Sequence, residues 1–106
     1  MKDWEIIWSS FAEKEIDNIH DYYLENANPK TAKKIVVGII KAPNSLQRNP
    51  DLGQIELALE GLKIEYRYIL FKSFKIIYSL DHQSKQIKIA DVFDTRQDPE
   101  KLKRKK

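Results

Sequence analysis

The sequence predicts an α+β fold in which an antiparallel four-stranded sheet carries two helices packed on one of its faces. Apolar residues recur at helical spacing in two segments and alternate with other residues in four more, in the order strand, helix, helix and three strands. Short connections between the last three strands favour an antiparallel meander, and two successive helices favour a single layer on the sheet. A chain of 106 residues fits one such domain.

The first strand is predicted over residues 2–8, where apolar and other side chains alternate. Its strongly buried face consists of Trp4, Ile6 and Trp8. Ser10 and Glu13 have the spacing of a capping box, so a helix is predicted from Ser10 to Glu25. The apolar stripe of this helix consists of Ala12, Ile16, Ile19 and Tyr23.

A second helix is predicted from Pro29, because a proline is well suited to the first helical position. Its apolar stripe consists of Ala32, Val36, Ile39 and Ile40. Pro43 would remove a backbone hydrogen bond and clash with the preceding turn, so the helix should kink or break near Lys41. The cluster of turn-forming residues at 49–53 then predicts a loop.

Three strands are predicted in the second half of the chain. Alternating apolar residues mark residues 66–71 and 74–79, and Lys72 with Ser73 forms a tight hairpin turn between them. A second turn at residues 81–84 leads to a final strand over residues 87–93, which is rich in β-branched and apolar side chains. These strands complete the predicted sheet.

Charge is distributed unevenly along the chain. The net charge is +3, but residues 101–106 alone carry +5, which leaves −2 for residues 1–100. A basic terminal run suits contact with phosphates, although such runs also serve as disordered, solubilising tails. We therefore predict one domain over residues 1–100, followed by a basic C-terminal tail over residues 101–106.

Several classes of site and location are excluded by composition. The absence of cysteine excludes disulfides, thiolate metal sites and cysteine nucleophiles. His20 and His82 are far apart and have no second ligand at helical spacing, so neither a metal nor another cofactor is expected. No apolar stretch approaches the roughly 20 residues that span a bilayer, and the N-terminus lacks a signal segment, so we expect a cytoplasmic protein without a membrane partner.

Six segments resemble, in order and spacing, the RelE/ParE superfamily, whose members are toxins of type II toxin-antitoxin systems and include plasmid stabilisation proteins. The segments are Ile7–Ser9, Phe11–Glu13, Asn49–Gly53, Glu65–Tyr68, Phe74–Tyr78 and Val92–Pro99. The resemblance implies a toxin that a cognate antitoxin binds and inhibits. It also implies one of two targets, which are DNA gyrase for ParE-like members and ribosome-bound mRNA for RelE-like members. A homodimer and a toxin-antitoxin hetero-oligomer both remain open.

The resemblance to the RelE-like branch implies three candidate catalytic residues of a metal-independent endoribonuclease: Arg67, Lys75 and Arg96. Cations of this kind stabilise the charge of a phosphorane during RNA cleavage. Two departures weaken this interpretation, because Ile69 stands in place of a second basic residue and no tyrosine follows Arg96. A two-residue hairpin turn would also place Arg67 and Lys75 on opposite faces of the sheet.

Each candidate has a structural interpretation beside the catalytic one. Arg67 can pair with Glu65 on the sheet surface, and Lys75 can be an ordinary lysine that lies at a sheet edge or faces solvent. Arg96 can be anchored in a turn by the neighbouring carboxylates, in which case it fixes the C-terminal segment. Whether the protein is an enzyme therefore stays open.

Three functional hypotheses follow from the resemblance. The segment 94–102 is more similar to ParE-type members, so we favour a toxin that acts by protein contact on DNA gyrase. The first alternative is a ribosome-dependent mRNA endonuclease of the RelE type. The second is a non-toxic member of the fold that is retained as an antitoxin-binding protein.

Overall fold

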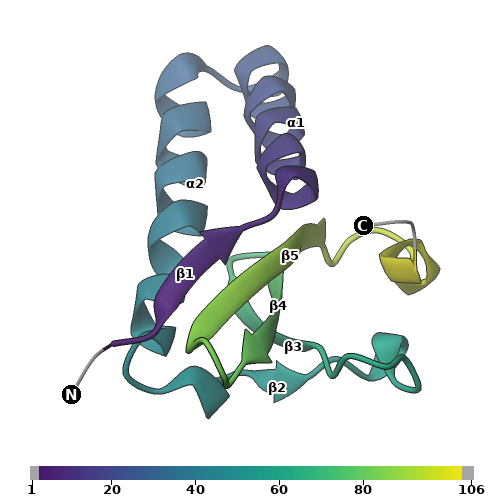
Figure 1. The fold of residues 1–106 in the computed structure, drawn as a ribbon. Helices are drawn as coiled ribbons and strands as arrows, with labels where there is room; N and C mark the ends of the chain where they lie inside the picture. The colour runs from purple at the N-terminus through teal and green to yellow at the C-terminus, as the bar shows by residue number, and fades with distance from the viewer. Residues whose placement is uncertain (1–2, 104–106) are drawn as a thin grey trace.

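Two helices cover one face of a five-stranded sheet in the computed structural model, which describes residues 3–103 (Figure 1). The helices are α1 (Ser10–Asn26) and α2 (Pro29–Lys41). The strands are β1 (Glu5–Trp8), β2 (Gln54–Ile55), β3 (Arg67–Phe71), β4 (Phe74–Asp81) and β5 (Gln86–Asp94). The order of helices and main strands confirms the predicted α+β class. In the described residues, neither helix has the length and apolar character that a membrane span requires.

The sheet differs from the prediction in two ways. Its strand order is β1-β5-β4-β3-β2, and β1 pairs in parallel with β5, so the sheet is mixed and not wholly antiparallel. The two-residue strand β2 adds a fifth strand, which pairs antiparallel with β3. Alternation of side chains identifies a strand but not its neighbour or direction, and two residues are too few to show alternation.

The antiparallel meander β3-β4-β5 forms as predicted. The turn between β3 and β4 consists of Lys72 and Ser73, because Phe71 pairs directly with Phe74. Lys72 adopts a left-handed φ of 53°, the backbone conformation that tight two-residue hairpin turns require. The predicted hairpin is therefore confirmed in position and in length.

Helix α1 begins at Ser10, but Ser9 is its cap. The Ser9 hydroxyl accepts a hydrogen bond from the Ala12 amide at 3.0 Å and donates one to the Ala90 carbonyl of β5 at 3.2 Å. The predicted capping box of Ser10 with Glu13 is thus wrong by one position. The cap at Ser9 both starts the helix and ties it to the sheet.

Helix α2 begins and ends as predicted. Pro29 occupies its first turn, and the Asn28 side chain caps it by accepting from the Thr31 amide at 2.8 Å. The α-helix stops at Lys41, and Pro43 lies in a following 3-10 helix, η1 (Ala42–Leu46). The chain then forms a second short 3-10 helix, η2 (Pro50–Leu52), before β2 begins.

The main core lies between the helices and the sheet. Its buried residues come from both helices and from β4 and β5, and include Ala12, Ile16, Ile35, Ile39, Phe74, Ile76, Tyr78, Ile87, Ile89 and Val92. Trp4, Ile6 and Trp8 pack against this core on the predicted face of β1, but each remains partly exposed. The first strand is less deeply buried than predicted because it lies at the edge of the sheet.

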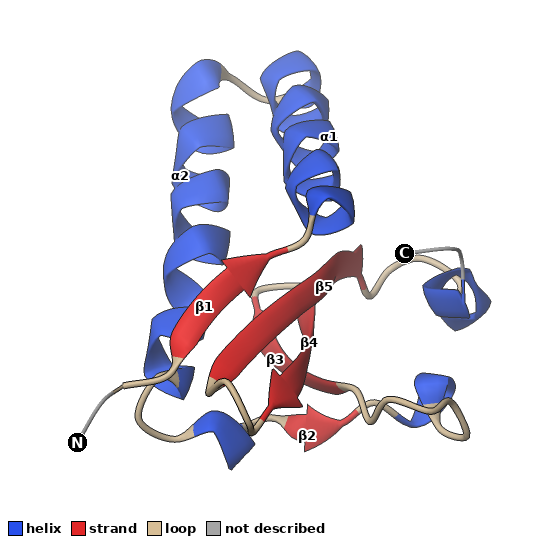
Figure 2. Cartoon of the chain, in the orientation of Figure 1, coloured by secondary structure: helices blue, strands red, loops and turns tan. Residues whose placement is uncertain are grey.

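A smaller core covers part of the other face of the sheet. It consists of Leu59, Ile77, Phe93 and Leu102. Leu59 and Leu102 come from two further 3-10 helices, η3 (Leu57–Leu59) and η4 (Pro99–Lys103), which are drawn as short helical turns in Figure 2. Leu102 is only 1% exposed, so the predicted domain end at residue 100 is wrong, and the folded domain extends at least to Lys103. The remaining predicted tail residues, 104–106, lie outside the described residues.

Candidate functional site

A cleft of about 500 Å³ opens between α1 and the C-terminal end of β5. We call it the Arg96 cleft, and its lining includes Ile19, Tyr22 and Tyr23 of α1, Phe74 and Val92 of the sheet, and Arg96. Tyr22 and Tyr23 stack edge to face, with ring centroids 5.2 Å apart. The cleft therefore combines apolar and aromatic walls with polar groups that include the carboxylates of Glu15 and Asp94 and the guanidinium of Arg96.

Asp94 fixes the side chain of Arg96. Nη2 of Arg96 lies 2.6 Å from Oδ2 of Asp94, Nε lies 3.0 Å from Oδ1, and the Arg96 amide donates to Oδ1 at 3.0 Å. The hydrogen bonds from Arg96 hold the pKa of Asp94 below its ordinary value of 3.8, and the carboxylate raises the pKa of Arg96. The predicted anchoring of Arg96 by a neighbouring carboxylate is confirmed.

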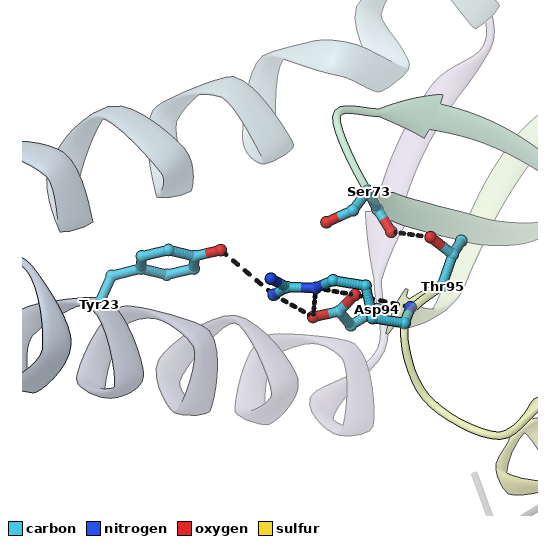
Figure 3. A network of polar contacts seen from close by, with 5 residues as sticks. Tyr23, Ser73, Asp94 and Thr95 are labelled. Atoms are coloured by element: carbon cyan, nitrogen blue, oxygen red, sulfur yellow. Dashed lines mark hydrogen bonds and ion pairs between the residues drawn. The ribbon is translucent and has the colours of Figure 1, made fainter.

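The turn that carries Arg96 is attached to two other elements. The amide and the hydroxyl of Thr95 each donate to the Ser73 carbonyl at 2.8 Å, which ties this turn to the β3-β4 hairpin. On the other side, Nη2 of Arg96 lies 3.5 Å from the hydroxyl of Tyr23, which projects from α1 toward it (Figure 3). The Arg96 side chain is thus held in position and still 60% exposed, so a partner can reach it.

Arg67 holds the loop that precedes β2. Its Nη1 donates to the Gly53 carbonyl at 2.9 Å, and its Nη2 lies 3.4 Å from Oε1 of Glu65, as the structural interpretation predicted. The buried Tyr78 hydroxyl assists by donating to the Pro50 carbonyl at 2.8 Å and accepting from the Gly53 amide at 3.0 Å. A Cβ atom at Gly53 would lie 2.4 Å from this hydroxyl, which explains the glycine.

Lys75 forms an ion pair that is largely buried. Its Nζ lies 2.6 Å from Oε1 of Glu56, a side chain that is only 4% exposed, and 4.2 Å from the ring centroid of Tyr68. The other carboxylate oxygen of Glu56 accepts from the Ala58 amide at 3.1 Å and so caps η3. The prediction that Lys75 faces solvent was wrong, because sequence reasoning missed Glu56, which lies 19 positions earlier and belongs to no repeating pattern.

The three sequence-predicted candidates do not converge in this structure. The register of β3 and β4 places Arg67 opposite Tyr78, on the helix-covered face, whereas Lys75 lies on the face of the smaller core. Arg96 lies apart from both, beside α1. Each basic side chain has its own protein partner. Within residues 3–103, no group of His, Asp and Glu side chains is arranged to hold a metal ion.

Comparisons with known proteins give a consistent picture. The family model described as the ParE toxin of the type II toxin-antitoxin system parDE matches residues 6–99. A chain of the chromosomal ParDE system from P. aeruginosa is 21% identical, with a TM-score of 0.69, and the match covers 86% of this chain and 95% of that one.

A chain of the toxin-antitoxin complex RelBE2 from Mycobacterium tuberculosis is 14% identical, with a TM-score of 0.63, and its match covers 89% and 93% of the two chains. A comparison with curated proteins gave no match. At these low identities, the two solved structures show a shared fold, and the family model adds a sequence match over most of the chain.

Proposed function

Because this chain belongs to the ParE toxin family of type II toxin-antitoxin systems, we propose that it acts as a toxin by protein contact on DNA gyrase in the cytoplasm. The observation that carries this proposal is the separation of the three basic candidates, combined with the exposed guanidinium of Arg96. RNA cleavage without a metal requires cations that meet at one phosphate. Protein contact requires only an accessible and well-positioned surface.

The environments of Arg67 and Lys75 argue against a nuclease site. Arg67 donates to a backbone carbonyl, and Lys75 is paired with a nearly buried carboxylate on the opposite face of the hairpin. A single phosphate could not contact both side chains without a rearrangement of the sheet. Residues 97–106 contain no tyrosine or histidine that could transfer protons.

The Arg96 cleft has the chemistry of a protein-contact site. Its aromatic and aliphatic walls suit an apolar side chain of the target, and the guanidinium of Arg96 suits a carboxylate or a carbonyl next to it. Tyrosine and arginine are enriched among residues that dominate binding energy at interfaces. The bidentate contact with Asp94 fixes Arg96 in advance, which lowers the entropy cost of binding.

A cognate antitoxin is the second proposed partner. The two structurally similar proteins are both described as parts of toxin-antitoxin systems. This chain has sheet edges at β1 and β2, and a groove between α1 and α2, which can accept an added strand or an amphipathic helix. We expect the antitoxin to use one or both, and an antitoxin helix in the groove would compete with self-association of the chain there.

The proposal is tested by inducing the chain in bacteria without its antitoxin and assaying gyrase supercoiling with the purified protein. We expect growth arrest and loss of supercoiling activity, and Arg96→Ala should weaken both. Arg48→Ala is the matched control, because this arginine has an 88% exposed side chain and only a weak contact with Asp3. Circular dichroism should show that both variants remain folded.

Primer extension on cellular mRNA tests the RelE-like alternative. Lys75→Ala alone is a poor probe, because it leaves the buried Glu56 carboxylate without its ion-pair partner. This should lower the free energy of unfolding by about 3–5 kcal/mol. The double variant Glu56→Leu with Lys75→Met removes both charges together. Codon-positioned cuts that disappear in the folded double variant would overturn the gyrase proposal. A chain that is not toxic but binds the antitoxin would instead be a non-toxic member of the family.

A further inference from the structure

Helices α1 and α2 form a helical hairpin whose charged residues are segregated by sign. Helix α1 contains five acidic residues and one lysine, whereas α2 contains four lysines and no acidic residue. All four lysines of α2 are exposed, as are Glu13, Asp17, Asp21 and Glu25 of α1. Within residues 3–103, no lysine of α2 forms an ion pair, and Asp21 of α1 lies 3.5 Å from Nδ1 of the adjacent His20. The exposed lysines of α2 and the exposed carboxylates of α1 can therefore be reached by a partner.

An apolar groove runs between α1 and α2. The groove has a volume of about 310 Å³, its apolar lining includes Ile16 of α1 with Val36 and Ile40 of α2, and Glu13 and Asp17 lie at its α1 side. Ile40 is 47% exposed although it belongs to a hydrophobic stripe. The end of the hairpin where α1 joins α2 projects away from the sheet (Figure 1), which leaves room for another helix pair.

Helical spacing aligns the charges with this groove. Asp17 and Asp21 are four residues apart and share one stripe of α1, while Lys30 and Lys33 are three residues apart and share one stripe of α2. The α1 side of the groove is thus acidic, and Lys33 continues the Val36–Ile40 stripe of α2 beyond its apolar lining. An occupant must present basic groups to α1, acidic groups to α2 and apolar groups between them.

We propose that this face binds a second copy of the same chain, with α1 of each copy against α2 of the other. In a two-fold symmetric dimer each contact occurs twice, so the acidic stripe of each copy meets the lysine stripe of its partner. The chain itself therefore supplies the charge pattern that the groove requires. A nucleic acid fits less well, because the carboxylates of α1 would repel its phosphates.

This dimer does not depend on the proposed action on gyrase. The Arg96 cleft uses Ile19, Tyr22 and Tyr23, whereas the groove uses Glu13 and Asp17 on another side of the same helix. Both surfaces can be occupied together. The dimer is also measured on the chain alone, so its failure and the failure of the toxin proposal are distinguishable.

Sedimentation velocity of the full chain, made by cell-free synthesis, tests the proposal. The native chain should change from monomer to dimer as its concentration rises through the micromolar range. The dimer should weaken in high salt, because the Debye length falls from about 10 Å at 0.1 M to about 3 Å at 1 M. A native chain that stays monomeric throughout would overturn the proposal.

Two charge-reversed chains make the test specific. Asp17→Lys with Asp21→Lys replaces the acidic stripe of α1 by lysines, and Lys30→Glu with Lys33→Glu replaces the lysine stripe of α2 by glutamates, so each chain alone should be monomeric. An equimolar mixture of the two should restore the dimer. Acidic residues suit the first turns of α2, where the helix dipole is positive, so the second variant should fold.

The matched control is a double reversal of equal charge at exposed lysines outside α1 and α2, Lys63→Glu with Lys72→Glu, which should leave the dimer intact. Charge-reversed chains that still dimerise alone, or a mixture that remains monomeric, would contradict the proposed face. Dimerisation by the native chain together with loss in the control variant would point to a different surface. A native monomer that binds an added antitoxin through this groove would assign the face to that partner.

Discussion

Removal of one buried hydroxyl, in Tyr78→Phe, should destabilise the fold strongly. The hydroxyl donates to the Pro50 carbonyl at 2.8 Å and accepts from the buried Gly53 amide at 3.0 Å. A buried polar group left without a partner costs about 1–3 kcal/mol. Water can partly replace the bond to Pro50, which is only partly buried. The total loss should therefore be about 2–3 kcal/mol, and Tm should fall by about 10–20 °C for a domain of this size.

Thermal melts followed by circular dichroism measure this effect against Tyr68→Phe. The Tyr68 hydroxyl bonds the exposed side chain of Gln54 at 3.1 Å, so the same chemical change should cost less than about 0.5 kcal/mol there. Equal melting temperatures for the two variants would refute the reasoning. They would mean that the loop before β2 is not held by Tyr78.

Two further predictions concern the C-terminal segment. Leu102→Ala should lower the free energy of unfolding by about 2–5 kcal/mol, because it opens a cavity in the smaller core. Leu57→Ala, at a side chain that is 70% exposed, should change this free energy little in urea unfolding. Equal effects of the two substitutions would contradict the burial of Leu102. Because the folded-state pKa of Asp94 is depressed by Arg96, its stabilisation is present above the unfolded value of 3.8 and is lost as pH falls through the folded value. Asp94→Asn should therefore lower stability at neutral pH and flatten its dependence on acid pH in urea titrations, and an unchanged acid profile would contradict the contact.

Local patterns were sufficient to predict most of the elements. Pro29 and Pro43 marked the start and the break of α2, and the two-residue turn at Lys72 and Ser73 set the register of the hairpin. That register correctly predicted that Arg67 and Lys75 lie on opposite faces of the sheet. These features depend on residues close together in sequence, where proline chemistry and side-chain alternation act directly.

Contacts between distant residues were not predictable in the same way. The parallel pairing of β1 with β5 joins segments about 80 positions apart, and alternation carries no information on direction. Leu102 is a single apolar residue among lysines, so no periodicity marked it as core. Glu56 reaches Lys75 across the sheet, and nothing in its local sequence distinguished it from an exposed glutamate.

The structure ranks three basic residues that the family resemblance treats alike. The side chains of Arg67 and Lys75 are 21% and 23% exposed, and each is committed to holding a nearby segment on the sheet. Arg96 is also paired with a carboxylate, that of Asp94, yet its side chain is 60% exposed and lies beside the Arg96 cleft. Substitution of Arg67 or Lys75 should therefore act first through folding. Substitution of Arg96 removes a guanidinium that is already in place for a partner, so toxicity should be more sensitive to it than stability is.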